Sequence, residues 1–257
     1  MYYEALGPIY FQDVFLGLDR ESSELNKKRF KGPVKNLGSF IEMLAEMMPK
    51  DRQAVGIDLG CGAHFFTNYT RERYGWGTIG FDQWEEAIEY ARLKYPQSAE
   101  AYQVCDFLNG IPFRDATMDF VFSNLVIQHF EDIELYEAFS EVSRVLRAGG
   151  VFSVIFKRWV NWEEFTRTTG LKANILDHYL GIVEIEEPML KKAINSANYE
   201  IIEKLSSSQR EGMREFRWYK NRQVLECGQK YALRPVALIE FNSGRGLPAT
   251  GIMFVKE

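Results

Sequence analysis

Residues 54–69, AVGIDLGCGAHFFTNY, combine a carboxylate with two closely spaced glycines. The apolar run 54–59 predicts a buried strand, Asp58 stands near its end, and Gly60 and Gly62 follow at once. Glycines here allow a tight turn and a close approach of backbone to ligand. A helix that starts just after them would offer unpaired N–H donors. The stretch therefore predicts a ligand-binding loop between a strand and a helix.

Two nucleotide-binding loops are disfavoured by the same residues. A dinucleotide fingerprint needs glycine or alanine at the third key position, where this chain has Phe65. A P-loop needs a glycine-lysine pair, and none follows. A loop for a pyrophosphate group is therefore a weak interpretation.

Three other polar residues stand at or near the ends of predicted strands. They are Asp82 at the end of 78–82, Asp106 in 101–107 and Asn124 in 118–126. Ligands of open parallel sheets bind beyond the carboxyl ends of the strands. We therefore expect these residues and Asp58 to line one crevice.

Strands and helices alternate from residue 37 to residue 156, which predicts a mostly parallel sheet with helices on both faces. The predicted helices are 37–48, 84–95, 132–148 with Gly149 as the stop, and 186–199; the predicted strands are 54–59, 78–82, 101–107, 118–126, 151–156, 199–205 and 249–257. The fold class is α/β, a Rossmann-like doubly wound seven-stranded sheet. Two aromatic-containing stretches, about 158–185 and 207–246, fit no simple unit and are expected to cover the crevice.

The motifs together resemble the class I S-adenosylmethionine-dependent methyltransferases. GIDLGCGAHFF is similar to their first motif, and CDF at 105–107 and EVSRVLRAGGVFSV follow in the family's order. IPFRDATMDFVFSNLVIQHFED resembles the fourth-strand region of the small-molecule branch, which includes the ubiquinone and menaquinone biosynthesis type. The resemblance covers roughly residues 37–156. It implies one domain over 1–257, with an N-terminal lid (1–36), a cofactor-binding core (37–156) and a C-terminal half (157–257).

The resemblance implies S-adenosylmethionine as cofactor, S-adenosylhomocysteine as product and no metal. Asp82 would hold the ribose hydroxyls, since a carboxylate can accept two hydrogen bonds from a diol, and Asp106 would bind the adenine amino group. Asp58 is reasonable beside an ammonium or sulfonium group. The residues expected to bind the cofactor are Asp58, Gly60, Cys61, Gly62, His64, Asp82, Gln83, Asp106, Phe107, Asn124, Tyr10 and Arg29.

His64 departs from the motif, because many such loops carry a third glycine there. It is either an early helix residue with a partly exposed ring, or a contact to the cofactor carboxylate or the substrate. A third reading is a decayed site, which the retained Asp58, Asp82 and Asp106 oppose.

Methyl transfer is an in-line displacement, so the protein mainly orients the acceptor and excludes water. A base is needed only if the acceptor must lose a proton. His129, after the fourth predicted strand, is the first candidate for this base, although a histidine here can simply pack or cap. His178, in the predicted cover, is a weaker candidate. Three histidines without clustered spacing do not predict a metal site.

The N-terminal segment MYYEALGPIYFQDVF is aromatic, and family members often use such a segment as a lid. Tyr10 could touch a sulfonium through its ring face, and Arg29 could pair with the cofactor carboxylate. The alternatives are core packing for Tyr10 and a solvated charged surface for Arg29.

The favoured substrate is a small molecule methylated at oxygen, nitrogen or carbon, and the aromatic residues of the predicted cover suggest a partly apolar or aromatic one. The fourth strand lacks the N-P-P-Y type sequence of the enzymes that methylate DNA adenine and protein glutamine. RNA or protein substrates remain a rival reading, supported by the basic and aromatic stretch 214–222. A non-catalytic cofactor-binding or scaffold protein of the same fold is the second rival.

Net charge and cysteine content limit the partners and the cellular compartment that we expect for this protein. The net charge of −5 offers no attractive field to nucleic acid or to an anionic membrane. Three widely spaced cysteines fit a reducing compartment. No secretory signal and no membrane span is expected, so the expected location is the cytoplasm. The oligomeric state is not predicted.

Overall fold

A seven-stranded sheet forms the centre of this computed structural model, which describes residues 35–62, 66–158, 219–242 and 248–257. Its strands are β1 (Val55–Leu59), β2 (Gly77–Asp82), β3 (Tyr102–Val104), β4 (Met118–Asn124), β5 (Leu146–Lys157), β6 (Leu233–Asn242) and β7 (Pro248–Lys256). Their order is β3-β2-β1-β4-β5-β7-β6. The first five are parallel, and β7 is antiparallel to both β5 and β6. The predicted doubly wound, mostly parallel seven-stranded sheet is confirmed.

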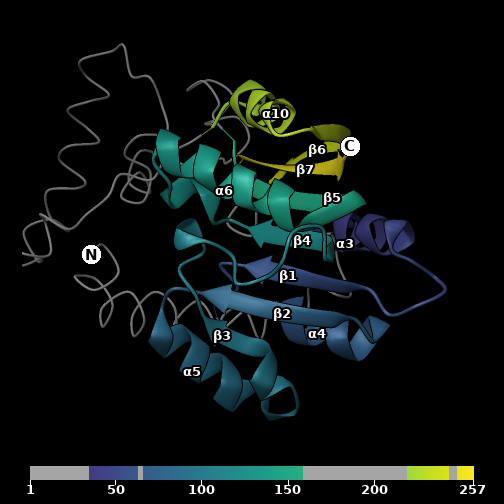
Figure 1. Cartoon of the computed structure of the whole chain (residues 1–257), viewed down its shortest axis with the longest axis vertical. Helices are drawn as coiled ribbons and strands as arrows, with labels where there is room; N and C mark the ends of the chain where they lie inside the picture. The colour runs from purple at the N-terminus through teal and green to yellow at the C-terminus, as the bar shows by residue number, and fades with distance from the viewer. Residues whose placement is uncertain (1–34, 63–65, 159–218, 243–247) are drawn as a thin grey trace, which may run out of the picture.

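Helices cover both faces of the sheet (Figure 1). The α-helices are α3 (Lys35–Met47), α4 (Phe66–Tyr74), α5 (Glu85–Lys94), α6 (Asp132–Val145) and α10 (Asn221–Lys230), and the 3-10 turns are η2 (Pro96–Ala101), η3 (Phe107–Asn109) and η4 (Ile127–His129). On one face, Phe40 and Leu44 of α3 share a buried cluster with Phe66 of α4 and Phe122 of β4. On the other face, buried side chains of α6 and α10 join a larger cluster with β1, β4, β5 and β7. This two-sided burial explains the nearly continuous apolar composition of the central strands.

The predicted elements between residues 37 and 156 are present, with several shifted boundaries. β3 is shorter than the predicted strand 101–107 and ends at Val104, so Asp106 lies beyond it. β4 ends at Asn124, because Leu125 turns the backbone to a φ of 58°. α6 ends at Val145 rather than at Gly149, since Leu146 is extended and pairs with Met118 of β4.

The prediction that all of 207–246 is an irregular cover is wrong for its described part. Residues 221–230 form α10, and residues 233–242 form the edge strand β6. Pro235 and a register shift between Pro235 and Ala237 interrupt the alternation that identifies a strand. In α10, Gly228 weakens the helical pattern, but a Cβ there would lie 2.4 Å from the Phe254 ring.

Other predictions lie outside the described residues. They are the helix 186–199, the strand 199–205, the cover stretch from residue 159 and the N-terminal lid up to residue 34. Among the helices that the structure describes, none has the length and apolarity needed to cross a bilayer.

Candidate functional site

The glycine loop leaves the carboxyl end of β1 with a backbone that only glycine adopts easily. Gly60 has a φ of 66° and Gly62 a φ of 49°, both in the left-handed region. A Cβ on Gly60 would lie 2.3 Å from a methyl carbon of Val126, just beyond the end of β4. The loop is thus pressed against the β4 side of the sheet, and both its conformation and its packing require Gly60.

Asp82, at the end of β2, holds this loop in position through hydrogen bonds to the backbone. Its Oδ2 accepts a 2.9 Å hydrogen bond from the N–H of Gly62, and its Oδ1 accepts one of 2.9 Å from the N–H of Trp84. Burial raises the pKa of Asp82, and the two amide donors partly offset that effect. Each carboxylate oxygen has a second lone pair, so Asp82 can still accept hydrogen bonds from a ligand diol.

Asp58 lies beneath the loop and is only 3% exposed. Its Oδ2 accepts a 2.9 Å hydrogen bond from the hydroxyl of Thr67, on α4. Burial, together with the negative charge of Asp82, raises the pKa of Asp58 to about 7, although the Thr67 hydrogen bonds oppose that rise. Asp58 can therefore gain or lose a proton near neutral pH.

The sheet brings Gly60, Asp82 and Asn124 to one level. Leu59 is in register with Phe81 on one side and with Ser123 on the other. Gly60, Asp82 and Asn124 are the residues that directly follow these three in the sequence. Asn124 is partly exposed at this edge. The carboxyl ends of β1, β2 and β4 thus supply one continuous polar rim.

Asp106 joins this rim from a turn rather than from a strand. The N–H of Cys105 donates to the carbonyl of Asp82 at 2.8 Å, which places the segment after β3 beside β2. Asp106 is exposed and caps η3, accepting hydrogen bonds from the N–H of Leu108 at 3.2 Å and the side chain of Asn109 at 2.7 Å. Its carboxylate is therefore oriented by its own turn.

The other predicted contact residues differ in their exposure. Gln83 is exposed beside Asp82. Phe107 is buried, with its ring edge-to-face with that of Phe130 at 5.8 Å. Cys61 is buried in a cluster with α5, and its N–H donates to the carbonyl of Phe81. Its buried thiol, whose pKa is raised by burial, faces the core rather than solvent.

His129 ends the turn η4 and is half-buried, close in sequence to the rim residue Asn124. The next residue, Phe130, accepts a 3.0 Å hydrogen bond from the buried Tyr219 hydroxyl through its carbonyl. Tyr219 thus anchors the end of the turn that carries His129.

Sequence reasoning missed Thr67, Val126 and Tyr219, each of which holds a predicted site residue or its loop. All three lie in stretches that the sequence analysis singled out, but their contacts connect different elements, so no spacing could have identified these roles. His64, His178, Tyr10 and Arg29 lie outside the described residues. Within the described ranges, no group of histidine, cysteine and acidic residues could hold a metal ion.

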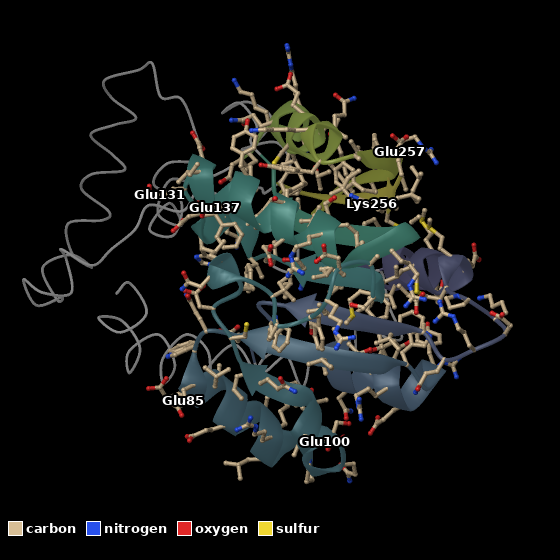
Figure 2. All side chains as sticks on the ribbon, in the orientation of Figure 1. Glu85, Glu100, Glu131, Glu137, Lys256 and Glu257 are labelled. Atoms are coloured by element: carbon tan, nitrogen blue, oxygen red, sulfur yellow. The ribbon has the colours of Figure 1, made fainter. Side chains whose placement is uncertain are left out.

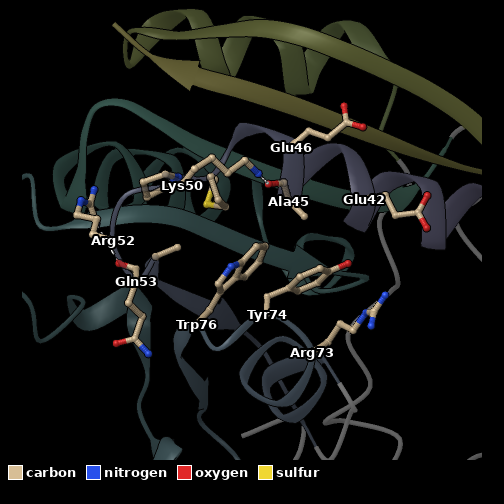
Figure 3. A pocket seen from close by; sticks show the side chains of 12 residues that line it. Glu42, Ala45, Glu46, Lys50, Arg52, Gln53, Arg73, Tyr74 and Trp76 are labelled. Atoms are coloured by element: carbon tan, nitrogen blue, oxygen red, sulfur yellow. Dashed lines mark hydrogen bonds between the residues drawn. The ribbon is translucent and has the colours of Figure 1, made fainter.

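A hollow of about 560 Å³ lies at the other edge of the sheet (Figure 3). Its floor includes Tyr74 and Trp76, whose rings are stacked at 4.8 Å, and Glu42 and Lys50 stand on its rim. It adjoins the amino ends of β1 and β2, away from the glycine loop. The charged and polar residues that line it are all exposed: Glu42, Glu46, Lys50, Arg52, Gln53 and Arg73. At the glycine loop, by contrast, hydrogen bonds within the fold hold the carboxylates of Asp58 and Asp82, so we place the functional site at the carboxyl edge.

Acidic side chains flank that carboxyl edge (Figure 2). Glu85, Glu131 and Glu137 are exposed on the side toward which β1, β2 and β4 point, whereas Lys256 and Glu257 lie on the opposite side. These three exposed carboxylates add negative charge on that side of the sheet.

Comparison with known proteins identifies the central part of the chain. Residues 57–154 match the family described as "Methyltransferase domain". The chain is 33% identical over 121 residues to a malonyl-[acyl-carrier protein] O-methyltransferase of Hahella chejuensis, covering 46% of this chain and 41% of that protein. It is 30% identical over 143 residues to a probable tRNA methyltransferase 9B of Mus musculus, covering 52% and 30%. The chain thus spans less than half the length of these relatives.

Solved structures share the fold. A methyltransferase from Methanosarcina mazei, described as SAM-dependent, matches with a TM-score of 0.58 and 15% identity, covering 83% of this chain and 96% of that one. Geranyl diphosphate C-methyltransferase from Streptomyces coelicolor A3(2) matches with a TM-score of 0.56 and 14% identity, covering 86% and 77%. The matched domain, the ordered motifs and this sheet topology agree, and residues 57–154 form a methyltransferase domain similar to those of the class I S-adenosylmethionine-dependent enzymes.

Proposed function

We propose that this protein is a methyltransferase that uses S-adenosylmethionine to methylate oxygen, nitrogen or carbon of a small molecule. The observation that carries the proposal is the glycine loop, clipped by Asp82 between the carboxyl ends of β1 and β2 inside the matched domain.

The described residues fit this cofactor in charge and hydrogen bonding. Its ribose diol suits the free lone pairs of Asp82, and its cationic groups suit the carboxylate of Asp58. No described residue offers the glycine-lysine phosphate cradle that a nucleotide triphosphate would need. The solved relative from Streptomyces coelicolor is in complex with S-adenosyl-L-homocysteine, which agrees with this choice.

When bound, the cofactor supplies an activated methyl group. In the proposed reaction the acceptor forms a bond to that methyl as the bond to sulfur breaks, and S-adenosylhomocysteine leaves. Asp58 and Asp82 would bind and orient the cofactor. His129 would take the proton of an acceptor that must lose one. The partly exposed Asn124 is proposed to lie where the cofactor site meets the acceptor site.

A malonyl thioester is the first acceptor to test, because several relatives are malonyl-[acyl-carrier protein] O-methyltransferases. A carboxylate acceptor is already deprotonated at neutral pH, so it would need no base. The three unpaired thiols agree with the proposed cytoplasmic location.

Isothermal titration with S-adenosylmethionine, S-adenosylhomocysteine and NAD tests the cofactor. We expect micromolar binding of both sulfur ligands, none of NAD, and a loss of about 100-fold or more in Asp82→Ala, since that change removes a charged hydrogen-bond partner. Glu72→Ala, an exposed carboxylate on α4, is the matched control. No binding of either sulfur ligand to the wild type would reject the cofactor and favour the scaffold reading.

Transfer of a labelled methyl group to an acceptor panel tests the reaction, with malonyl-acyl carrier protein as the first member. His129→Asn tests whether this histidine acts as a general base or only packs in the turn. With a protonated acceptor we expect the turnover rate to fall by about 100-fold without a change in cofactor affinity. With a carboxylate acceptor, the variant should stay within about threefold of the wild type.

RNA is the rival substrate, suggested by the mouse relative. The described part of 214–222 does not support it, because Tyr219 is buried and Arg222 pairs with Glu226 at 2.6 Å. The exposed Glu85, Glu131 and Glu137 would also repel phosphates that approach them. Salt-sensitive retention and methylation of tRNA, with no transfer to small molecules, would reverse this preference.

A further inference from the structure

We propose that Thr67 is a positioning residue of the cofactor site, holding the Asp58 carboxylate in its ionised, ligand-binding orientation from helix α4. The inference rests on the proposed function and extends it to a residue outside the glycine motif. Its consequence is a cofactor affinity that depends on the proton of Asp58.

Three adjoining strands build the surroundings of Asp58. Asp58 on β1 is in register with Gly80 on β2, and Gly80 with Tyr102 on β3. The three residues therefore form one row across the sheet, directed toward the helices α4 and α5. Thr67 is fully buried above this row and donates its hydroxyl to Asp58 at 2.9 Å.

Gly80 creates the space in which Thr67 sits. A Cβ at position 80 would lie 2.7 Å from the Thr67 hydroxyl and 2.9 Å from the Cys61 sulfur. Any side chain there would push Thr67 away from Asp58. A glycine on β2 and a threonine on α4 thus make one arrangement that fixes a carboxylate on β1.

The described groups that face Asp58 make Thr67 the important donor. Asp82 adds a negative charge from β2, and the Cys61 thiol and the Tyr102 phenol interact with Asp58 electrostatically. Burial raises the pKa values of Cys61 and Tyr102, so both stay neutral when Asp58 titrates. Thr67 is the only described side chain for which a hydrogen bond to Asp58 is found, and it favours the charged form.

A bound cation would complete the arrangement. The cofactor brings an ammonium and a sulfonium group, either of which favours ionised Asp58. Because the pKa of free Asp58 is about 7, binding should be about tenfold tighter at pH of about 8 than at pH of about 6.

The test measures the affinities for S-adenosylmethionine and S-adenosylhomocysteine by calorimetry across this pH range, using the full chain. Thr67→Val keeps the side-chain shape and removes the hydroxyl. We expect it to weaken binding about fivefold at neutral pH and to move the midpoint of the pH profile upward. Thr67→Ser should restore both values, and Gly80→Ala should resemble Thr67→Val.

Thr70→Val is the matched control. Thr70 is fully buried on the same helix, but its hydroxyl pairs with that of Thr78 and with the Phe66 carbonyl. This variant should lose stability without moving the pH midpoint. Asp58→Asn should remove the part of the pH dependence that Asp58 causes, leaving only what the ligand contributes.

Three results have distinct meanings. If the wild type binds and Thr67→Val has the same affinity and pH midpoint, the positioning role is rejected while the proposed function stands. A pH profile unchanged in Asp58→Asn rejects the proton linkage. If the wild type binds neither sulfur ligand, the proposed function fails and the role of Thr67 with it.

Discussion

Two buried carboxylates lie on neighbouring strands at opposite ends of the sheet, and their surroundings differ sharply. Asp58 is 3% exposed near the carboxyl end of β1, and Asp119 is 4% exposed near the amino end of β4. Asp58 has a hydroxyl donor and a negative neighbour. Asp119 has two arginines and a main-chain donor.

The partners of Asp119 are close and complementary. Arg52 donates to both of its oxygens, at 2.7 Å and 2.5 Å, Arg147 lies 3.1 Å away, and the N–H of Val55 donates at 2.9 Å. Burial alone would raise the pKa of Asp119, but these hydrogen bonds and charges outweigh it and hold the pKa below its ordinary value. One carboxylate is satisfied within the protein, while the other retains a need for positive charge. A cationic ligand can therefore supply at Asp58 the positive charge that Arg52 and Arg147 supply at Asp119.

The largest expected effect is on stability, from Asp119→Ala. The change leaves Arg147 and the Val55 N–H without their acceptor, so the free energy of unfolding should fall by about 3 kcal/mol. Urea unfolding measures this loss, with Asp115→Ala, an exposed partner of Arg144, as the control. Cofactor affinity should remain within about twofold, and a large loss of affinity would contradict the division between the two ends.

Asp58→Asn should raise, rather than lower, the stability of the protein relative to wild type as the pH increases toward 7. The unfolded chain ionises this carboxyl near its ordinary pKa, whereas the folded protein keeps the proton up to about pH 7. Between these values the folded state binds more protons, so wild-type stability decreases as the pH rises. From a pH of about 5.5 to about 7, the stability of the variant relative to wild type should rise by about 2 kcal/mol.

Thermal unfolding of both proteins across this pH range measures that change. A relative stability of Asp58→Asn that stays constant would mean that Asp58 is ionised throughout. Cofactor affinity should fall in the variant even where its stability rises, because a neutral amide attracts a cation less than a carboxylate does.

The smallest expected effect belongs to Arg52→Lys. Arg52 is partly exposed, so its ion pair is screened by solvent, but its two-pronged contact with Asp119 cannot be reproduced by lysine. The melting temperature should fall less than in Asp119→Ala, and the cofactor affinity should not change. A fall as large as that of Asp119→Ala would show that Arg52 alone compensates the buried charge.

Local patterns were sufficient for the central part of the fold. Apolar runs of strand length, helical spacing in α3, α5 and α6, and Gly60 with Gly62 act within a few residues, so the chain itself reveals them. The order of these elements then determines which strand ends meet. For this reason Asp82 and Asn124 were expected at the same edge of the sheet, and the strands that carry them end side by side with β1.

Contacts between distant segments were beyond the reach of the sequence. β6 was missed because Pro235 and a bulge interrupt its alternation, while its pairing with β7 decides its conformation. Asp106 was placed at a strand end, but its own hydrogen bonds to Leu108 and Asn109 turn it into a cap.

The sequence by itself determined the family resemblance, the mostly parallel sheet of the core and the types of residue at the ligand edge, because these depend on local periodicity and chain order. Only the tertiary structure decided the charge states. Asp58 and Asp119 are the same residue type in similar apolar strands, but their pKa values shift in opposite directions. Burial and the partners brought by α4, β2 and the segment before β1 cause that difference, and they come together only when the chain folds.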